Sequence, residues 1–291
     1  MKKNFLIIAT ILFIIVSCKN KTTEQNDISN SDSTATQSLI PSLPEGKDSS
    51  YIKDTIDFGY PIESDIKLSL DEILTKHFLA IGQDKINKVQ TKIITGKTLA
   101  GGKSVKFKNI FKRPNKSYAE VDYGEHVFYQ GYDGEKGWRL YTLESEVPLY
   151  VYGEQLQAIK DQSKFDNPLS EYKEKGLKLE LYGMSEIEGK SVYRIKMVNK
   201  GINILYFFID AQDFKLVKAL TRITYTNQES DYETLFSNYK MVDEILMAFQ
   251  IEEIVNNQYY SRTIIENVEF DAAVDDDIFK MPESEVDQEV P

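Results

Sequence analysis

Residues 104–142 read SVKFKNIFKRPNKSYAEVDYGEHVFYQGYDGEKGWRLYT, and apolar and polar side chains alternate along most of this stretch. Alternation with a period of two is typical of half-buried β-strands. The pattern predicts strands over 104–112, 116–122, 126–130 and 137–142. The run DGEKG at 133–137 supplies turn-forming residues between the last two strands. This stretch therefore predicts consecutive antiparallel strands joined by tight turns.

The same alternation continues on both sides of this stretch. One further strand is predicted before it, over 88–96. After it, strands are predicted over 177–186, 191–199, 203–210, 216–227, 231–240, 247–256 and 259–270. Glycines at 183, 189 and 201 stand where turns between these strands are needed.

A helix is predicted before the first strand. Ser69 precedes Asp71 and Glu72, and Gly82 follows the apolar residues, as at the two ends of many helices. The residues at helical spacing on one face are Ile73, Leu74, His77, Phe78 and Ile81. Since His77 belongs to this apolar stripe, we expect a core or edge histidine rather than a ligand or catalytic residue.

A second helical region interrupts the strands at 154–176, where the alternation stops. Apolar residues there suggest two short helices, separated at Asn167-Pro168 because proline cannot continue a helix. The whole order is a helix, five strands, a helical insert and about seven strands. It predicts a mainly β protein with one strongly curved antiparallel sheet. Such a sheet either closes into a barrel or curls around helices, a ligand or both.

The chain is acidic, with a formal net charge of -11 over 291 residues. This charge argues against a nucleic-acid partner and against electrostatic docking on anionic lipid. Eighteen Tyr and 15 Phe residues are ample for a β-rich core.

The N-terminal residues predict a targeting signal. Lys2 and Lys3 precede an apolar run over 5–16 that is too short to span a bilayer comfortably. Ile15-Val16-Ser17-Cys18 then resembles the lipobox of bacterial lipoproteins. The resemblance implies a signal peptide over 1–17 and lipidation of Cys18 by diacylglycerol and a further acyl chain, which would hold the protein on a membrane. The alternative is an ordinary signal peptide that happens to end in Cys.

Cys18 is the only cysteine, so no internal disulfide can form. Residues 18–50, with the lipidated Cys at their start, lack aromatic residues and are rich in Ser, Thr, Asn, Asp and Gln, a composition typical of a disordered tether. Residues 51–68 are a transitional segment. The folded domain is expected over 69–291.

Three groups of motifs resemble the LolA/LolB lipoprotein-localisation family. Phe111-Lys112-Arg113-Pro114-Asn115 is followed by Val127-Phe128-Tyr129 and Tyr132-Asp133-Gly134-Glu135-Lys136-Gly137-Trp138, similar to the family's "RPN … DGK-x-x-W". Segments 181–183, 188–193 and 206–210 are similar to later family strands, and 277–282 to its closing "F-x-x-P". The resemblance covers roughly 70–282.

The resemblance implies an incomplete barrel whose apolar hollow is capped by a helical lid and accepts acyl chains. It also implies that Arg113 lies inside the hollow and bonds to the lid. The alternative to this role is an exposed strand-end Arg beside Pro114. Trp138 either lines the hollow or belongs to the core. The family's membrane-bound receptor carries an exposed apolar residue on an early hairpin loop, and Leu99 is the candidate for this membrane contact here.

The pleat of the strands predicts which side chains point into the hollow. Lys106 and Lys108 favour the solvent side of their strand, which leaves Val105 and Phe107 inside. On the later strand, the apolar set consists of Tyr193, Ile195 and Met197. With Arg113 and Trp138, these are the predicted ligand contacts.

We expect no enzyme. His77 and His126 have no partner at metal spacing, and the chain has neither a Gly-rich phosphate loop nor Gly-x-Ser-x-Gly. No catalytic residue, metal ligand or cofactor is therefore assigned.

The expected function is that of a lipid-anchored protein on the periplasmic face of the outer membrane of a Gram-negative bacterium. It would bind a lipid or the acyl chains of a lipoprotein, in lipoprotein sorting or localisation. The alternatives are a non-enzymatic envelope interaction protein with a filled core and, third, a lipid hydrolase. The sequence leaves the oligomeric state open.

Overall fold

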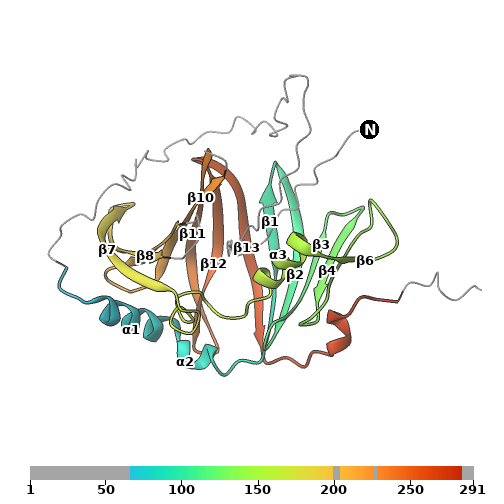
Figure 1. Cartoon of the computed structure of the whole chain (residues 1–291), viewed down its shortest axis with the longest axis horizontal. Coiled ribbons are helices and arrows are strands. Elements are labelled where there is room, and N and C mark those ends of the chain that lie inside the picture. Colours follow the sequence, from blue (N-terminus) through green and yellow to red (C-terminus); the bar gives the residue numbers. More distant parts are fainter. Residues whose placement is uncertain (1–65, 199–203, 226–227, 284–291) are drawn as a thin grey trace, which may run out of the picture.

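The computed structural model describes residues 66–198, 204–225 and 228–283 (Figure 1). The signal peptide, Cys18 and the tether predicted from the sequence lie outside the described residues. The first described helix, α1 (Leu70–Ile81), confirms the prediction for this segment. The Ser69 side chain accepts a hydrogen bond from the Glu72 amide while Glu72 accepts one from the Ser69 amide, and Gly82 ends the helix in the left-handed conformation. A short helix, α2 (Gln83–Ile86), follows at once.

The strands of the described residues form one 13-stranded sheet in which every neighbouring pair is antiparallel. The first half comprises β1 (Thr91–Ala100), β2 (Lys103–Lys112), β3 (Lys116–Asp122), β4 (Val127–Tyr132), β5 (Gly137–Tyr141) and β6 (Leu149–Val151). The second half comprises β7 (Lys178–Ile187), β8 (Lys190–Val198), β9 (Ile204–Asp210), β10 (Leu216–Tyr225), β11 (Gln228–Val242), β12 (Ile245–Val255) and β13 (Gln258–Phe270).

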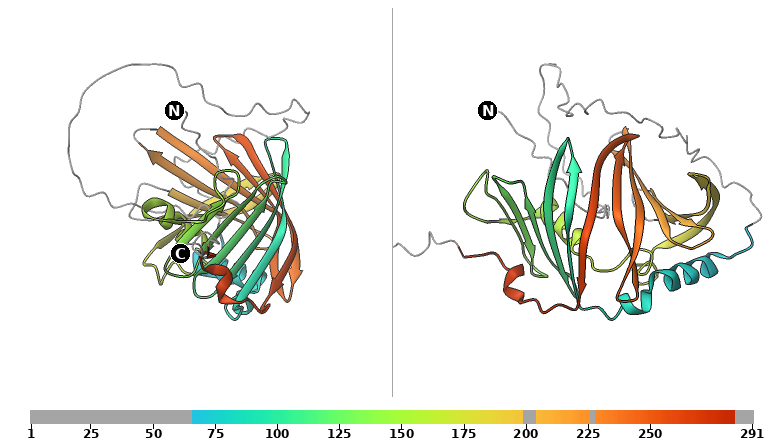
Figure 2. Two further views of the ribbon diagram at one scale, coloured as in Figure 1. Left: turned by 90° about the vertical axis from the view of Figure 1, so that its right-hand side faces the viewer. Right: turned by 180° about the vertical axis from the view of Figure 1, so that it is seen from behind.

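The spatial order of the strands is β6-β5-β4-β3-β2-β1-β13-β12-β11-β10-β9-β8-β7. The first and last strands of the chain therefore pair at the middle of the sheet, and β6 and β7 are its two edges. The sheet bends strongly but does not close (Figure 2). The prediction of a mainly β protein with a single antiparallel sheet in an incomplete barrel is confirmed.

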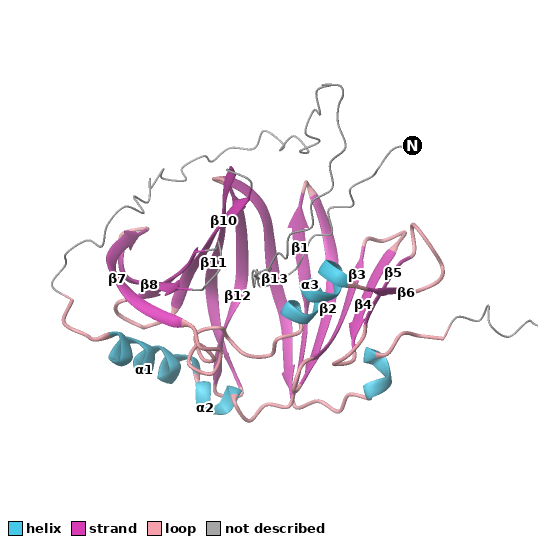
Figure 3. Ribbon diagram, in the orientation of Figure 1, coloured by secondary structure: helices cyan, strands magenta, loops and turns pink. Residues whose placement is uncertain are grey.

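The two edges are joined by residues 152–177, which we call the crossover. It contains the helix α3 (Gly153–Gln162) and passes across one face of the sheet (Figure 3). The prediction of a second short helix after Asn167-Pro168 is wrong. The Asn167 side chain accepts a hydrogen bond from the Leu169 amide at 2.8 Å, and turns replace the helix. The sequence also did not predict β6 or the 3₁₀ helix η1 (Asp276–Phe279).

Two hydrophobic clusters share the face of the sheet that the helices cover. One is built on β1, β2, β12 and β13 and includes Val105, Phe107 and Ile251, with Phe165 of the crossover packed into it. The other is built on β8 and β9 and contains Ile73 and Leu74 of α1. The helix therefore fills one half of the hollow, and the crossover covers part of the other.

Candidate functional site

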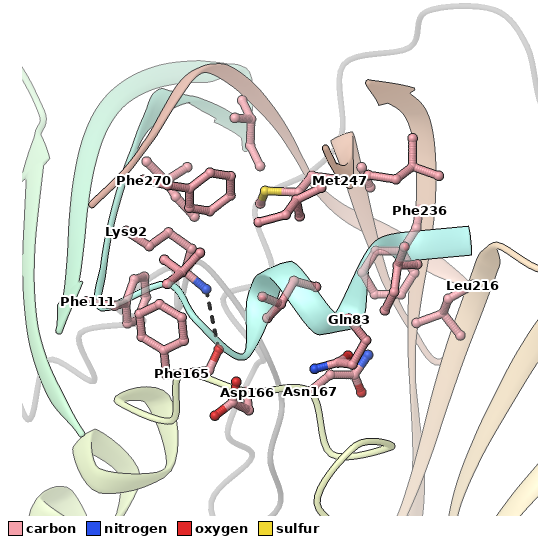
Figure 4. Close-up of a pocket in the computed structure, with 18 of the residues that line it drawn as sticks. Gln83, Lys92, Phe111, Phe165, Asp166, Asn167, Leu216, Phe236, Met247 and Phe270 are labelled. Atoms are coloured by element: carbon pink, nitrogen blue, oxygen red, sulfur yellow. Dashed lines mark hydrogen bonds between the residues drawn. The ribbon is translucent and has the colours of Figure 1, made fainter. Parts of the chain in front are cut away.

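A cavity of about 180 Å³ lies where α1, α2, the crossover and the sheet meet (Figure 4). Its lining is mainly apolar and comes from segments far apart in the sequence. The apolar lining residues include Ile81, Ile86, Ile94, Phe111, Phe165, Phe236, Met247, Ile251 and Ile265. A largely apolar cavity with a few polar groups is typical of a small-molecule site.

Arg113 fastens the crossover beside this cavity. Its guanidinium donates to both carboxylate oxygens of Asp166, at 2.6 Å from Nη2 to Oδ1, and lies 4.3 Å from the centre of the Phe165 ring. It also donates to the carbonyl oxygens of Val89 at 2.8 Å and Ile86 at 3.1 Å. Both partners of the ion pair are largely buried, so one side chain ties the crossover to the connection between α2 and β1.

Lys92 brings a positive charge into the apolar lining. Its Nζ lies 4.9 Å from the centre of the Phe111 ring and 4.6 Å from that of the Phe165 ring. It donates one long hydrogen bond of 3.5 Å to the Phe165 carbonyl oxygen, the dashed line in Figure 4. Burial lowers the pKa of the Lys92 ammonium from 10.5 to about 8, and Arg113 lowers it further while Asp166 opposes both.

Two buried acceptor atoms mark another part of the lining. The His77 ring bonds through Nδ1 to the Phe214 carbonyl oxygen at 2.8 Å, so Nδ1 carries the proton and Nε2 is an acceptor. Burial lowers the pKa of His77, which favours this neutral form. Neither His77 Nε2 nor Gln83 Oε1 has a hydrogen-bond partner among the described residues. A ligand hydroxyl or amide group could satisfy them.

Two solved structures with this architecture cover most of the chain. A DUF1329 family protein from Desulfovibrio piger ATCC 29098 has a TM-score of 0.51 at 14% identity, over 72% of this chain and 97% of that chain. A LolA superfamily protein from Nitrosomonas europaea has a TM-score of 0.50 at 11% identity, over 73% of this chain and 98% of that chain. The chain has a LolA/LolB-like fold. No protein-family model matches it, and no curated protein is significantly similar in sequence.

The predicted ligand contacts of the LolA/LolB-like domain lie in the clusters around the cavity rather than in its lining. Val105 and Phe107 are buried on the helix-covered face while Lys106 and Lys108 are exposed, as the pleat requires. The three β8 residues, Tyr193, Ile195 and Met197, are buried in the cluster that contains α1. Arg113 bonds to three lining residues, Ile86, Val89 and Asp166, without being one.

Trp138 of β5 is buried outside the cavity lining. Its Nε1 donates to the Phe279 carbonyl oxygen at 2.9 Å, and its ring lies so close to Gly131 that a Cβ there would be 2.2 Å from Nε1. The contact joins the Trp of the family-like motif to the closing "F-x-x-P" segment. This side chain therefore acts as core.

Leu99 lies in strand β1 and not, as predicted, on the hairpin loop. Gly101 and Gly102 both have positive φ, so two residues suffice for the turn, and Leu99 remains paired with Ser104 and Arg262. Its side chain is 37% exposed. A membrane contact at Leu99 stays a prediction.

The sequence did not single out Lys92 or Asp166. One signal was available for Lys92, because it shares its parity on β1 with buried Ile94 and thus stood on the apolar face. Asp166 carried no signal, since its importance depends on the path of the crossover.

No group of His, Cys, Asp and Glu side chains in 66–198, 204–225 and 228–283 could hold a metal ion. Across the same residues, none of the helices is both long enough and apolar enough to cross a bilayer.

Proposed function

We propose that this protein binds an apolar chain of a lipid or lipoprotein in the cavity beneath the crossover. The observation that carries the proposal is the cavity itself, lined by Ile94, Ile251 and Ile265 and covered by Phe165. The LolA/LolB-like fold supports it. Binding and release need no covalent step, so the proposal is a carrier or receptor rather than an enzyme.

The size of the cavity sets the affinity that this conformation can provide. A cavity of roughly 150 Å³ accepts a benzene molecule, so about 180 Å³ suits a chain segment of about six carbons. At about 0.8 kcal/mol per buried methylene, such a segment gains about 5 kcal/mol, which corresponds to a dissociation constant of roughly 0.2 mM. A longer chain would bind more tightly only where the crossover moves away from the sheet.

The contacts that hold the crossover are of a kind that can open. At the cavity, Asp166 and Phe165 attach it to Arg113, and Phe165 packs into the cluster on β1, β2, β12 and β13. Ser163 and Leu169 hold the crossover on either side of this point. We infer that ligand entry displaces the crossover from the cavity. The same contacts form again when the crossover returns over the bound chain.

The place of the protein in the cell is part of the proposal. Cys18 would carry the lipid anchor, residues 18–50 would act as the tether, and residues 69–291 would form the binding domain. We place the protein on the periplasmic face of the outer membrane, where lipoprotein sorting takes place. An envelope interaction protein with a filled core is the alternative, and the cavity favours ligand binding over it.

The test is a titration of the protein with octanol, an uncharged single-chain alcohol of which the cavity would hold about six carbons, observed through ¹³C-labelled Ile methyl groups. We expect shifts of the Ile94, Ile251 and Ile265 signals and a sub-millimolar to millimolar dissociation constant. Met247→Trp should fill the cavity and abolish the shifts. The control Met241→Trp, at a 62% exposed position of the neighbouring strand, should bind as the wild type does.

Unchanged circular dichroism would show that Met247→Trp folds. Absence of any Ile methyl shift in the wild type would refute the proposal and favour the filled-core alternative.

A further inference from the structure

We propose that the cavity selects a single-chain amphiphile with an anionic head, and that Lys92 pairs with that head. The inference rests on the proposed function, because it names the class of ligand that the same cavity takes. It concerns the one lysine that β1 directs into the apolar lining next to Ile94.

The surroundings of Lys92 leave its charge without a counter-ion. Within the described residues it forms no ion pair, and its one hydrogen bond, to the Phe165 carbonyl oxygen, is 3.5 Å long. The carboxylate whose charge raises the pKa of Lys92, that of Asp166, already accepts from two nitrogens of Arg113. An ammonium has three donors, so at least two remain for a ligand.

The other charged groups near the cavity reinforce this arrangement. Arg113 lies on the connection between β2 and β3, and Lys164 lines the cavity from the crossover. Lys164 pairs with Asp161, and Arg113 pairs with Asp166. Each acid is therefore matched by a base, and Lys92 is left as the excess positive charge at an apolar site.

The two aromatic rings do not replace a counter-ion. A ring face attracts a cation by about 0.5–2 kcal/mol, less than the desolvation of a buried ammonium. The lowered pKa of Lys92 agrees with this balance, since the site stabilises the charged form less well than water does. A ligand carboxylate or phosphate beside Nζ would stabilise the charged form and so raise the pKa of Lys92.

The positive charge and the acceptor atoms belong to different parts of the cavity lining, an arrangement that fits one amphiphilic chain. The cationic Lys92 lies beside Phe111 and Phe165, whereas the acceptor atoms His77 Nε2 and Gln83 Oε1 belong to α1 and α2. Acceptors repel an anion, so the head must lie at Lys92 and the chain must run between the sheet and α2. A cavity of about 180 Å³ suits one such chain.

The experiment compares octanoate, octyl phosphate, octanol and octylammonium in the same Ile methyl titration at pH 7. We expect octanoate or octyl phosphate to bind at least about tenfold more tightly than octanol, as for a hydrogen bond to a charged group, and octylammonium to bind most weakly. The tighter of the two anions identifies a fatty-acid carboxylate or a phosphate monoester as the head group.

Two variants test the role of Lys92. Lys92→Met should bind octanoate and octanol equally while its affinity for octanol is kept, and Lys92→Arg should restore part of the preference. Lys106→Met, at an exposed position of β2, is the matched control and should keep the wild-type preference.

The outcomes separate this inference from the proposed function. Equal binding of octanoate and octanol by the wild type, or a preference that survives Lys92→Met, would overturn the role of Lys92 but leave the cavity as a binding site. Failure of all four compounds to bind would overturn both.

Discussion

Replacing Lys92 by Met should make the ligand-free protein more stable at pH 7. The pKa of Lys92 falls from 10.5 to about 8 in the folded state. Each pKa unit corresponds to about 1.4 kcal/mol, so holding the charged side chain in the cavity costs about 3 kcal/mol. Solvent reaches part of this side chain, and the variant loses two ring contacts, so we expect a gain of about 1–2 kcal/mol.

The gain should depend on pH in a defined direction. Below pH 8 Lys92 is protonated in both states, and the folded state bears the full cost. Between about pH 8 and 10.5 the unfolded chain still binds the proton that the folded protein has lost, so wild-type stability rises. Met does not titrate, so the stability of the variant does not rise in this way. The difference in unfolding free energy between the variant and wild type should therefore shrink over this pH range.

Urea unfolding at pH 7, 8, 9 and 10 measures the difference directly, and Lys106→Met controls for the loss of one surface charge. Tyrosine titration is common to all the variants and cancels in the comparison. A Lys92→Met variant that is less stable than wild type at pH 7, or an advantage that stays constant to pH 10, would refute the reasoning that Lys92 is an uncompensated charge.

Three further predictions concern other parts of the chain. Asp166→Asn should lower the free energy of unfolding by about 1–3 kcal/mol and speed octanol exchange, because Arg113 loses its counter-ion. A double-mutant cycle with Arg113→Met should show a coupling energy above about 1 kcal/mol. Additive effects would contradict the role of the ion pair. Gly131→Ala should lower the free energy of unfolding by about 1–3 kcal/mol, because its Cβ would meet the Trp138 ring. An unchanged melting temperature would count against this contact. Cys18→Ser should abolish fatty-acid labelling and membrane partitioning in cells, and a variant that still labels would exclude the proposed anchor.

The strands and the first helix could be predicted because their signals are local. Val105 and Phe107 alternate with exposed lysines, and Ser69 and Gly82 bound α1 as caps. The three-residue strand Leu149–Val151 could not be predicted, since it is too short to show a period and forms only because β5 offers it an edge.

The site depends on packing that no local pattern contains. The alternation of side chains along β8 was the only reason to predict Tyr193 and Ile195 as ligand contacts. In the structure, α1 packs on this part of the sheet and occupies the space that a ligand would need there. The cavity instead forms where Lys92, Asp166 and Met247 meet, and these residues come from three widely separated segments. Only the long-range order of strands brings them together.

The crossover also sets a mechanical limit on the domain. Because residues 152–177 connect one edge of the sheet to the other, flattening the sheet would draw this segment out between the two edges. The 10 residues of α3 span about 15 Å as a helix but about 33 Å when extended. Unwinding α3 would add roughly 18 Å to the reach of this segment, which would let the half-barrel open further while both edge strands stay connected.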